Sequence, residues 1–398
     1  MTDEKLAELS RCVPTPFYVF DKSLFRRRAE LVKQEFGPKT SLCFSIKANP
    51  FLLDGLPEVF DRIEVCSPGE LTICEKTHAD MKKVIFSGVN KTKADIERAL
   101  RDGVGTFTAE SLLHLQLIQQ CAAAHGSRVP ILLRLTGGSQ FGMDEADIFH
   151  VLENRDSFNN IEIVGLHYFT GTQKRKVSVI EKELDYLDQF LETIQRKYGL
   201  RLQHLEYGTG LAVDYFSHSP EDTELERLRS VAPRIRAMAE KVSLTIEMGR
   251  FFAAPCGYYF TRVMDIKTNL GVHYAILDGG IHQLKYDGQI QGMQQPSIRH
   301  IAGSDTGYTL PWTLCGSLCT TADVLARNVE LRSLQVGDIL VFQRTGAYSV
   351  MEGMAVFLSR DMPAVATYTP EAGLKILRDR IDTARFNTPV TDTPGGYK

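Results

Sequence analysis

The chain alternates between short apolar runs, which read as buried strands, and longer segments whose apolar residues recur every three or four positions, as in amphipathic helices. PGELTICEKTHAD, KADIERALRDG and VIEKELDYLDQFLETIQRKYG are such helical segments, and several end at or near glycine. The predicted strands are Ser41–Lys47, Ile63–Cys66, Val84–Gly88, Thr106–Ala109, Ile131–Leu135, Ile161–Tyr168, His204–Gly208 and Ser243–Gly249. A doubly wound sheet would also alternate, but eight successive units favour a closed TIM (β/α)8 barrel.

The pattern changes after FFAAPCGYY. YYFTRVMDIKT, HYAILDGG, RNVELRSLQVGDILVFQR and AVATYT read as strands separated by turn residues. PFYVFD is a further strand ahead of the first barrel unit, and we expect it to pair within the same second domain. The sequence therefore predicts an α/β fold with a barrel at 24–255, an all-β domain formed by 1–23 and 256–380, and a loosely held tail at 381–398.

Composition narrows the function. The 398 residues are 43% hydrophobic and 24% charged, which is enough apolar material for two domains. A net charge of −3 gives no basic footprint for nucleic acid, so a small ligand is the better expectation. We find no apolar run long enough for a membrane span and no signal-peptide pattern, and eight cysteines without CxxC or metal-ligand spacing indicate a reducing, cytoplasmic setting without a bound metal.

Polar residues gather at the carboxyl ends of the predicted barrel strands, where barrel enzymes place their active sites. Lys47 ends the first strand in SIKANP, His167 lies at the sixth in GLHYFTGTQ, and Glu247 lies at the eighth in EMGR. Taken singly, a lysine at a strand end is commonly a solvated charge, and a glycine turn such as YGTG is commonly an ordinary connection. Their joint placement on one face indicates a site. Other polar residues at these ends are Glu64, Ser67, Asn90, Glu110 and Arg134.

This combination of groups indicates pyridoxal 5′-phosphate (PLP) as cofactor. Lys47 supplies an amine that could bind the cofactor's aldehyde. The turns in TGTQ and YGTG offer backbone amides and hydroxyls suited to a phosphate. Glu247 could keep the pyridine nitrogen protonated, and His167 could stack on the ring.

Several motifs, SIKAN, EVCSPGEL, GLHYFTGTQ, EMGR and GAYS, occur in an order that resembles the fold type III PLP-dependent decarboxylases of ornithine, arginine and diaminopimelate. The resemblance spans nearly the whole chain and implies an alanine racemase-like fold, decarboxylation of an L-amino acid, and a head-to-tail homodimer with shared active sites. SQFGMDE, HYFTGTQ, YFSH and SLCTTADVL are most similar to the branch acting in antibiotic biosynthesis on glutamate carried as a thioester on an acyl carrier protein.

The resemblance also assigns roles, including Schiff-base lysine for Lys47. Cys319 in SLCTTAD matches the catalytic cysteine contributed by the neighbouring subunit, and Asp323 aligns with a substrate-facing carboxylate. Cys315 competes for the cysteine's role, but the TTADVL that follows Cys319 favours the latter. The further cofactor contacts that we expect are Arg134, Thr172, Gly208, Thr209, Gly210, Gly249, Arg250 and Tyr348.

Two departures from the family pattern bear on substrate and cofactor. Thr320 stands where ornithine and diaminopimelate enzymes carry an acidic residue, which argues against a free distal amine. Thr209 stands where a glycine is common, although its hydroxyl could still donate to phosphate. The alternatives left open are a diaminopimelate- or ornithine-type decarboxylase, a siderophore-precursor decarboxylase, a PLP racemase, and a non-catalytic PLP-binding relative.

Two hypotheses concern how a substrate is recognised. Lys174, Arg175 and Lys176 in TGTQKRKVS follow the sixth strand, and they could form a basic docking surface for an acidic carrier protein, unless the segment is simply a solvated loop. Arg299 in PSIRH could bind a substrate carboxylate.

Overall fold

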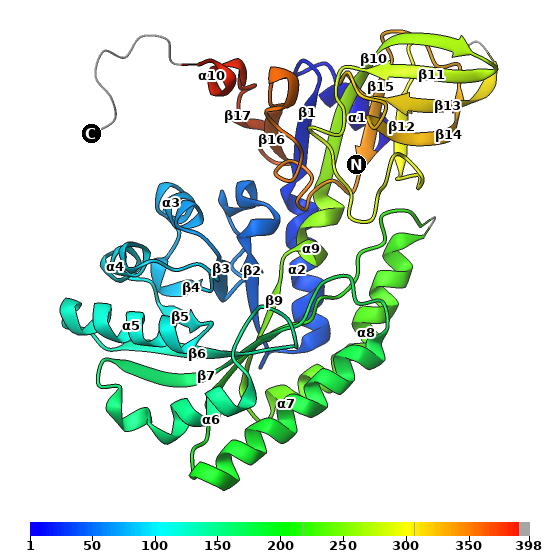
Figure 1. The fold of residues 1–398 in the computed structure, drawn as a ribbon. Coiled ribbons are helices and arrows are strands. Elements are labelled where there is room, and N and C mark those ends of the chain that lie inside the picture. The colour runs from blue at the N-terminus through cyan, green and yellow to red at the C-terminus, as the bar shows by residue number, and fades with distance from the viewer. Residues whose placement is uncertain (218, 306, 390–398) are drawn as a thin grey trace, which may run out of the picture. The chain divides into compact units, whose positions relative to one another are not determined.

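Parallel strands close into a barrel in the computed structural model of the chain, which describes residues 1–217, 219–305 and 307–389 (Figure 1). Within these residues the barrel strands are β2 (Ser41–Ser45), β3 (Arg62–Val65), β4 (Val84–Phe86), β5 (Thr106–Ala109), β6 (Val129–Leu135), β7 (Ile161–Phe169), β8 (His204–Gly208) and β9 (Ser243–Met248). Each strand pairs with its neighbour in sequence, and β9 pairs with β2 to complete the closure. The predicted TIM barrel is confirmed.

Helices follow the barrel strands, and their side-chain caps explain where several begin. Ser67, Ser111 and Asp144 each accept a hydrogen bond from a backbone N–H three residues on. The helices are α2 (Lys22–Phe36), α3 (Pro68–Lys76), α4 (Lys93–Arg101), α5 (Leu112–His125), α6 (Glu145–Glu153), α7 (Val177–Tyr198), α8 (Pro220–Ala239) and α9 (Arg250–Ala253). None of the helices in the described ranges is long and apolar enough to cross a bilayer.

Short 3-10 turns occur at several connections. They are η1 (Ile46–Ala48), η2 (Pro50–Leu53), η3 (Met81–Lys83), η4 (Arg155–Ser157), η5 (Ala254–Cys256) and η6 (Phe357–Ser359). η1 and η2 lie directly after β2, so the chain turns sharply at the carboxyl end of the first barrel strand.

A second compact unit, the β domain, contains residues 1–25, 215–217 and the described residues from 253 onward. Its strands are β1 (Phe17–Asp21), β10 (Gly257–Asn269), β11 (Val272–Leu277), β12 (Ile298–Ile301), β13 (Thr309–Cys315), β14 (Val324–Arg332), β15 (Ile339–Gln343), β16 (Ala364–Thr369) and β17 (Gly373–Arg378). The main path of the sheet runs β14-β13-β11-β10-β1-β16-β17, and β15 pairs with both β10 and β12. The predicted second sheet domain is confirmed.

Strand β1 is the segment predicted from PFYVFD, and it lies between β10 and β16. Figure 1 shows it in blue beside the orange β16, with which it pairs in parallel from Phe17 opposite Ala364. Phe17 stacks on Phe260 of β10 with ring centroids 4.5 Å apart. The sheet therefore joins segments that are far apart in the sequence.

The sequence interpretation missed helix α1 (Asp3–Leu9), whose Leu6 and Leu9 pack into the core of the β domain. The predicted tail also holds structure in its described part. Ile381 and Met362 exchange backbone hydrogen bonds, and α10 (Ala384–Asn387) follows. Residues 390–398 lie outside the described residues.

Candidate active site

Lys47 lies just beyond β2, because the strand ends at Ser45 and the chain turns through η1. Predicting the strand as far as the lysine was therefore wrong by two residues. The motif SIKANP explains the turn: the Asn49 side chain accepts a hydrogen bond from the Phe51 backbone N–H, and Pro50 opens η2. The lysine side chain consequently leaves the strand at its carboxyl end.

The Lys47 amine is held by two carboxylates. Its Nζ donates to Glu64 Oε2 at 2.8 Å and to Oε1 at 3.0 Å, and it lies 3.5 Å from Glu247 Oε1. The lysine side chain is 34% exposed, whereas that of Glu64 is 2% exposed. The nitrogen thus reaches inward from an accessible side chain to a buried anionic pair.

Glu247, on β9, is hydrogen-bonded on both carboxylate oxygens. Ser45 Oγ donates to Oε1 at 2.9 Å, and His167 Nε2 lies 2.9 Å from Oε2. Burial alone would raise the pKa of Glu247, but the charge of Lys47 and the hydrogen bonds from His167 and Ser45 outweigh it and hold this pKa well below its usual range. Glu247 is therefore a buried carboxylate that stays ionised.

The motif EVCSPGEL orders the chain after β3. Cys66 donates from Sγ to Glu64 Oε1 at 2.9 Å, and its backbone N–H donates to Glu70 Oε2 at 2.6 Å. Burial, followed by the charge of Glu64, raises the pKa of Cys66, so its sulfur is a neutral donor at physiological pH. This thiol helps to orient the carboxylate that binds Lys47.

Glu206 is a second buried carboxyl group of the barrel, which the sequence interpretation missed. It lies on β8 opposite His167 of β7 and is 1% exposed. Apart from the thiol of Cys43, its oxygens have no hydrogen-bond partner among the described residues. Burial, with the charges of Glu247 and Glu64 next, raises its pKa well above the usual value, so Glu206 remains protonated when Glu247 is ionised.

We expect Glu206→Gln to become more stable relative to the native protein as pH rises. Above the ordinary glutamate pKa of 4.5, the folded protein keeps a proton that the unfolded chain releases. This costs up to about 1.4 kcal/mol of unfolding free energy for each pH unit until the folded pKa is reached. Denaturant unfolding at several pH values between about 5 and 8 measures the difference. A difference that does not change with pH would show that Glu206 titrates normally.

Glycine is required at two of the predicted phosphate-binding positions by close packing. Gly210 has φ +61°, and a Cβ there would lie 2.0 Å from the Gly171 carbonyl oxygen. A Cβ on Gly249 would lie 2.7 Å from that of Ala48. Gly208 ends β8 beside these turns. The turns after β7, β8 and β9 thus present backbone at the carboxyl ends of their strands.

Three further predicted phosphate contacts, Thr172, Arg250 and Thr209, make different hydrogen bonds. Thr172 Oγ1 accepts a hydrogen bond from Arg250 Nε at 3.4 Å, so these two predicted phosphate contacts lie together. Thr209 is fully buried, and its hydroxyl accepts from the Leu211 N–H at 3.3 Å. That contact uses one lone pair and leaves its O–H available as a donor.

Arg134 is committed to a carboxylate on the neighbouring strand. Its Nη1 donates to Glu110 Oε1 at 2.5 Å, and the other oxygen of Glu110 accepts from the Gly142 N–H at 3.1 Å. Both side chains are more than nine-tenths buried. This pairing suits a structural link between β5, β6 and the loop after β6 better than the predicted cofactor contact.

The candidate cysteines lie in the β domain and differ in exposure. Cys319 is exposed in the loop between β13 and β14, whereas Cys315 is half-buried at the end of β13. Burial and then the charge of Asp323 raise the pKa of Cys315. Of the two thiols, Cys319 is the more accessible.

Asp323, predicted to face substrate, is instead buried at 2% exposure. Its two oxygens accept from the backbone N–H groups of Ile281 and Leu318, each at 2.8 Å. Thr320 is half-buried, and its hydroxyl accepts from the Ala322 N–H at 3.3 Å. In this chain Asp323 therefore fastens the loop that carries Cys319.

Two further predicted site residues, Tyr348 and Arg299, lie in the β domain. Tyr348 has φ +66°, a left-handed backbone conformation that is costly for an aromatic residue and often marks functional loops. Arg299 is the exposed residue of β12, and its guanidinium binds Asp3 Oδ1 at 2.5 Å and 2.8 Å. That ion pair attaches α1 to the sheet, and the predicted substrate contact of Arg299 stays a prediction.

Lys174, the first residue of the predicted basic docking surface, is largely buried. The Lys174 side chain is 9% exposed, and its Nζ binds both oxygens of Glu183, at 2.6 Å and 2.9 Å. Arg175 is exposed but pairs with Asp214 at 2.5 Å. Lys176 is exposed at the start of α7. Asp214 also binds Arg227, so only Lys174 is withdrawn from this surface, while Arg175 and Lys176 remain exposed and the docking surface stays a prediction.

The donors at the barrel rim fit PLP. Lys47 offers an amine, Glu247 an ionised carboxylate suited to a protonated pyridine nitrogen, and His167 a ring fixed through Nε2. The buried Nδ1 of His167 has no hydrogen-bond partner among the described residues. The glycine turns with Thr172 and Arg250 supply groups suited to the phosphate. Within the same part of the chain, no group of His, Cys, Asp and Glu is suited to a metal ion.

Known proteins resemble the chain over most of its length. The L-glutamyl-[BtrI acyl-carrier protein] decarboxylase of Niallia circulans is 26% identical over 386 residues, covering 90% of each protein. The diaminopimelate decarboxylase of Aquifex aeolicus is 27% identical over 398 residues, covering 94% of this chain and 91% of its own.

Solved structures and a family description agree with these relatives. The diaminopimelate decarboxylase of Helicobacter pylori, solved in complex with L-lysine, has a TM-score of 0.84 at 22% identity and covers 96% of this chain and 99% of its own, which shows the shared fold. Residues 22–254 match the pyridoxal binding domain of pyridoxal-dependent decarboxylases. The chain therefore belongs to the PLP-dependent amino-acid decarboxylases, enzymes that release the carboxylate of an amino acid as CO2.

Proposed function

We propose that the enzyme decarboxylates an L-amino acid whose side chain carries no free distal ammonium, most suitably glutamate held as a thioester on an acyl carrier protein, in a pathway of secondary metabolism. The Niallia circulans relative, whose name gives a carrier-linked glutamyl substrate, supports this choice. The diaminopimelate decarboxylases among the relatives make a free diamino acid the competing substrate.

The loop 316–323 carries the proposal. A distal ammonium needs an accessible anion, and the carboxylate of this loop belongs to Asp323. Asp323 is buried, and backbone N–H groups bind both of its oxygens. Thr320 adds a neutral hydroxyl where related diamino-acid enzymes carry an acid. The loop thus lacks an exposed negative charge for a second amine.

The barrel residues prepare the amine for reaction. Lys47 becomes a nucleophile only after it loses a proton, and Glu64 Oε2, 2.8 Å from its Nζ, is placed to take that proton. Glu247 stays ionised and would hold a proton on the pyridine nitrogen of bound PLP, and His167, fixed to Glu247, would contact the ring. Bound PLP supplies an electron sink for the negative charge that develops at the substrate Cα as CO2 leaves.

Cys319 returns a proton to the substrate Cα after CO2 leaves. In this proposal the cysteine acts across a homodimer, so that each active site combines the barrel of one subunit with the loop 316–323 of the other. The exposure of Cys319 within its own chain suits a residue that completes a site in a partner.

We expect Cys319→Ala to lower turnover on the order of 100-fold and to raise the share of aldehyde by-product, because the proton no longer reaches Cα selectively. Cys315→Ala is the matched control and should stay close to the native rate. Product analysis by mass spectrometry, alongside CO2 release, separates the two effects. A Cys315→Ala variant with the larger loss would reverse the assignment.

CO2 release from a panel of substrates tests the proposed function. The PLP-loaded enzyme is given free L-glutamate, L-ornithine and diaminopimelate, and L-glutamate loaded on an acyl carrier protein. We expect turnover of the loaded glutamate and at least about 100-fold lower kcat/KM for the free diamino acids, a difference of about 2.7 kcal/mol in transition-state binding. Efficient turnover of ornithine or diaminopimelate would refute the proposed substrate class.

A further inference from the structure

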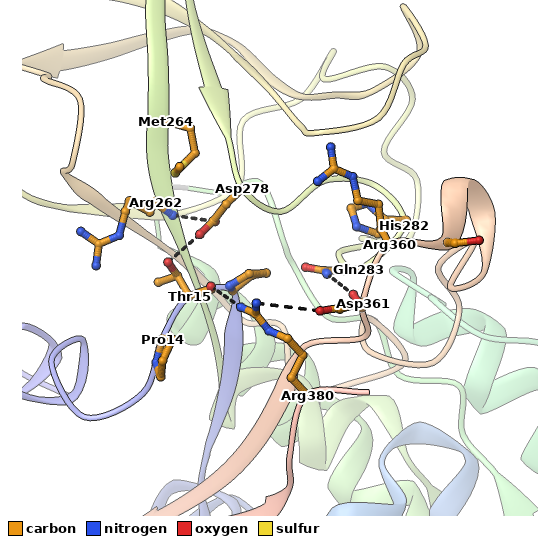
Figure 2. Close-up of a pocket in the computed structure, with 12 residues that line it drawn as sticks. Pro14, Thr15, Arg262, Met264, Asp278, His282, Gln283, Arg360, Asp361 and Arg380 are labelled. Carbon is orange, nitrogen blue, oxygen red and sulfur yellow. Dashed lines mark hydrogen bonds and ion pairs between the residues drawn. The ribbon is translucent and has the colours of Figure 1, made fainter. Parts of the chain in front are cut away.

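A cavity of about 550 Å³ lies wholly within the β domain, and none of the residues assigned so far to catalysis lines it. Figure 2 shows its lining. It is formed by residues 14–16, strand β10, the segment 278–283, the segment 359–361 and Arg380. Its size is within the range of pockets that hold small organic ligands. The Met264 and proline side chains add apolar surface to an otherwise polar wall.

His282 is the unusual residue of this cavity. It is 2% exposed, and neither ring nitrogen has a hydrogen-bond partner among the described residues. Burial, followed by the charge of Arg360, lowers its pKa to about 4, so the ring is neutral at physiological pH and offers one N–H donor and one acceptor. A buried polar ring without a partner lining a cavity indicates that a ligand or water supplies the missing contacts.

The acidic residues of the wall are already engaged. Asp278 accepts from the hydroxyls of Thr15 and Thr261, at 2.6 Å and 2.7 Å, and from the Arg262 backbone N–H at 2.9 Å. Asp361 Oδ2 lies 3.9 Å from Arg380 Nη1. The partners of Asp278 are neutral donors, so it keeps its negative charge, but the three arginines of the wall outnumber its two aspartates.

Two of the three arginines keep donors available. Arg360 donates from Nη2 to the Ser317 carbonyl at 2.9 Å and has no carboxylate partner in the part of the chain that the structure describes. Arg380 donates from Nη2 to the Thr15 carbonyl at 2.5 Å. The Arg262 guanidinium points away from Asp278 in Figure 2 and donates from Nη1 to the Gly337 carbonyl at 3.0 Å. Arg360 and Arg380 thus leave guanidinium N–H groups for an anion.

The same wall supports the loop that carries Cys319. The Ser317 backbone N–H donates to the Gly279 carbonyl at 2.8 Å, and the Ile281 N–H donates to Asp323 at 2.8 Å. Arg360 contacts the loop as well, through the Ser317 carbonyl. A ligand that draws Arg360 or His282 into the cavity would therefore act on the loop 316–323.

We propose that this cavity binds a small molecule that carries a phosphate or carboxylate group, with Arg360 and Arg380 holding the anion and His282 supplying a neutral polar contact. The anion can come from the phosphopantetheine arm of a carrier or from a free anionic metabolite. This binding goes beyond the decarboxylation and does not depend on which amino acid is decarboxylated.

Calorimetric titration of the PLP-loaded protein tests the proposal with inorganic phosphate, citrate and 4′-phosphopantetheine. We expect saturable binding of at least one probe and at least tenfold weaker binding in Arg360→Gln, with part of the affinity kept in Arg360→Lys. Arg332→Gln, which removes an exposed arginine of the same domain, is the control for net charge and should bind as the native protein does. Circular dichroism confirms that each variant is folded. Binding of 4′-phosphopantetheine alone supports the carrier as source, whereas binding of phosphate or citrate supports a free metabolite.

The rate at which iodoacetamide alkylates Cys319, read from peptide masses, gives a second measurement. The bound probe should change this rate at least threefold in the native protein and leave it unchanged in Arg360→Gln. Absence of binding by all three probes at millimolar concentration, or equal affinity in the native protein and Arg360→Gln, would overturn the proposal. Neither result depends on decarboxylase activity, so failure here is distinct from failure of the proposed substrate.

Discussion

Lys47→Arg should abolish covalent attachment of PLP and lower decarboxylation by a factor on the order of 10³ to 10⁶. Arginine keeps a positive charge beside Glu64 and Glu247 but stays protonated, so it cannot act as the nucleophile. The variant therefore separates the lysine's chemistry from its ion pair, which holds two buried carboxylates together. Absorbance of the bound cofactor and CO2 release measure the two losses.

Lys91 is the competing lysine in the barrel. It is 3% exposed, donates to the Gly88 carbonyl, and has its pKa lowered to about 8, chiefly by burial. An amine of lowered pKa can also be a nucleophile, so the attachment has to be mapped. Borohydride reduction followed by peptide mass spectrometry should place the pyridoxyl group on Lys47. A label on Lys91 would contradict the assignment and leave Lys47 as the counter-ion of Glu64.

Glu247→Gln should lower turnover on the order of 100-fold or more while the protein stays folded. Glutamine preserves the size of the side chain and can still bond with Ser45 and His167, but it removes the ionised carboxylate that keeps the pyridine nitrogen protonated. The change also removes the ion pair with Lys47, and the lowered pKa of Glu247 shows that its ionised form stabilises the folded protein, so we expect the variant to be less stable at neutral pH. Steady-state kinetics and thermal unfolding of the same preparation measure both quantities.

Glu247→Asp tests the charge separately from its position. It keeps the carboxylate but withdraws it by one methylene, so activity should fall between that of the native enzyme and that of Glu247→Gln. Native turnover in Glu247→Gln would show that the carboxylate charge is unnecessary. Equal losses in both variants would show that position matters more than charge.

The barrel was predictable from sequence because its strands are short, apolar and regularly spaced, and each is followed by a helix. The predicted and observed ends agree to within two residues for all eight barrel strands, and Thr106–Ala109 agrees at both ends. The end of β2 was the informative error: Ile46 is buried like a strand residue, so its apolarity hides the turn that begins there. Hydrophobic pattern shows burial but not where a buried chain stops being extended.

The site was only partly predictable, because contacts across the barrel leave little trace in a single sequence. Lys47, His167 and Glu247 come together as the strand order predicted. The placement of Glu206 on the inner face could have been found from strand alternation with Gly208, but its lack of a charged or hydroxyl partner could not. Lys174 was predicted to be a surface charge because its partner, Glu183, lies nine residues further on, in α7, and the sequence does not show that the two side chains meet.

The position of β1 affects the order in which the chain can fold during synthesis. β1 leaves the ribosome early, yet its partners β10 and β16 are made after the entire barrel. Most barrel strands pair with strands next to them in the sequence, so the barrel can fold while β1 is still an unpaired apolar strand. Newly made chains therefore pass through a stage in which the apolar strand β1 is exposed and unpaired. Chaperone binding at that stage would protect them from aggregation.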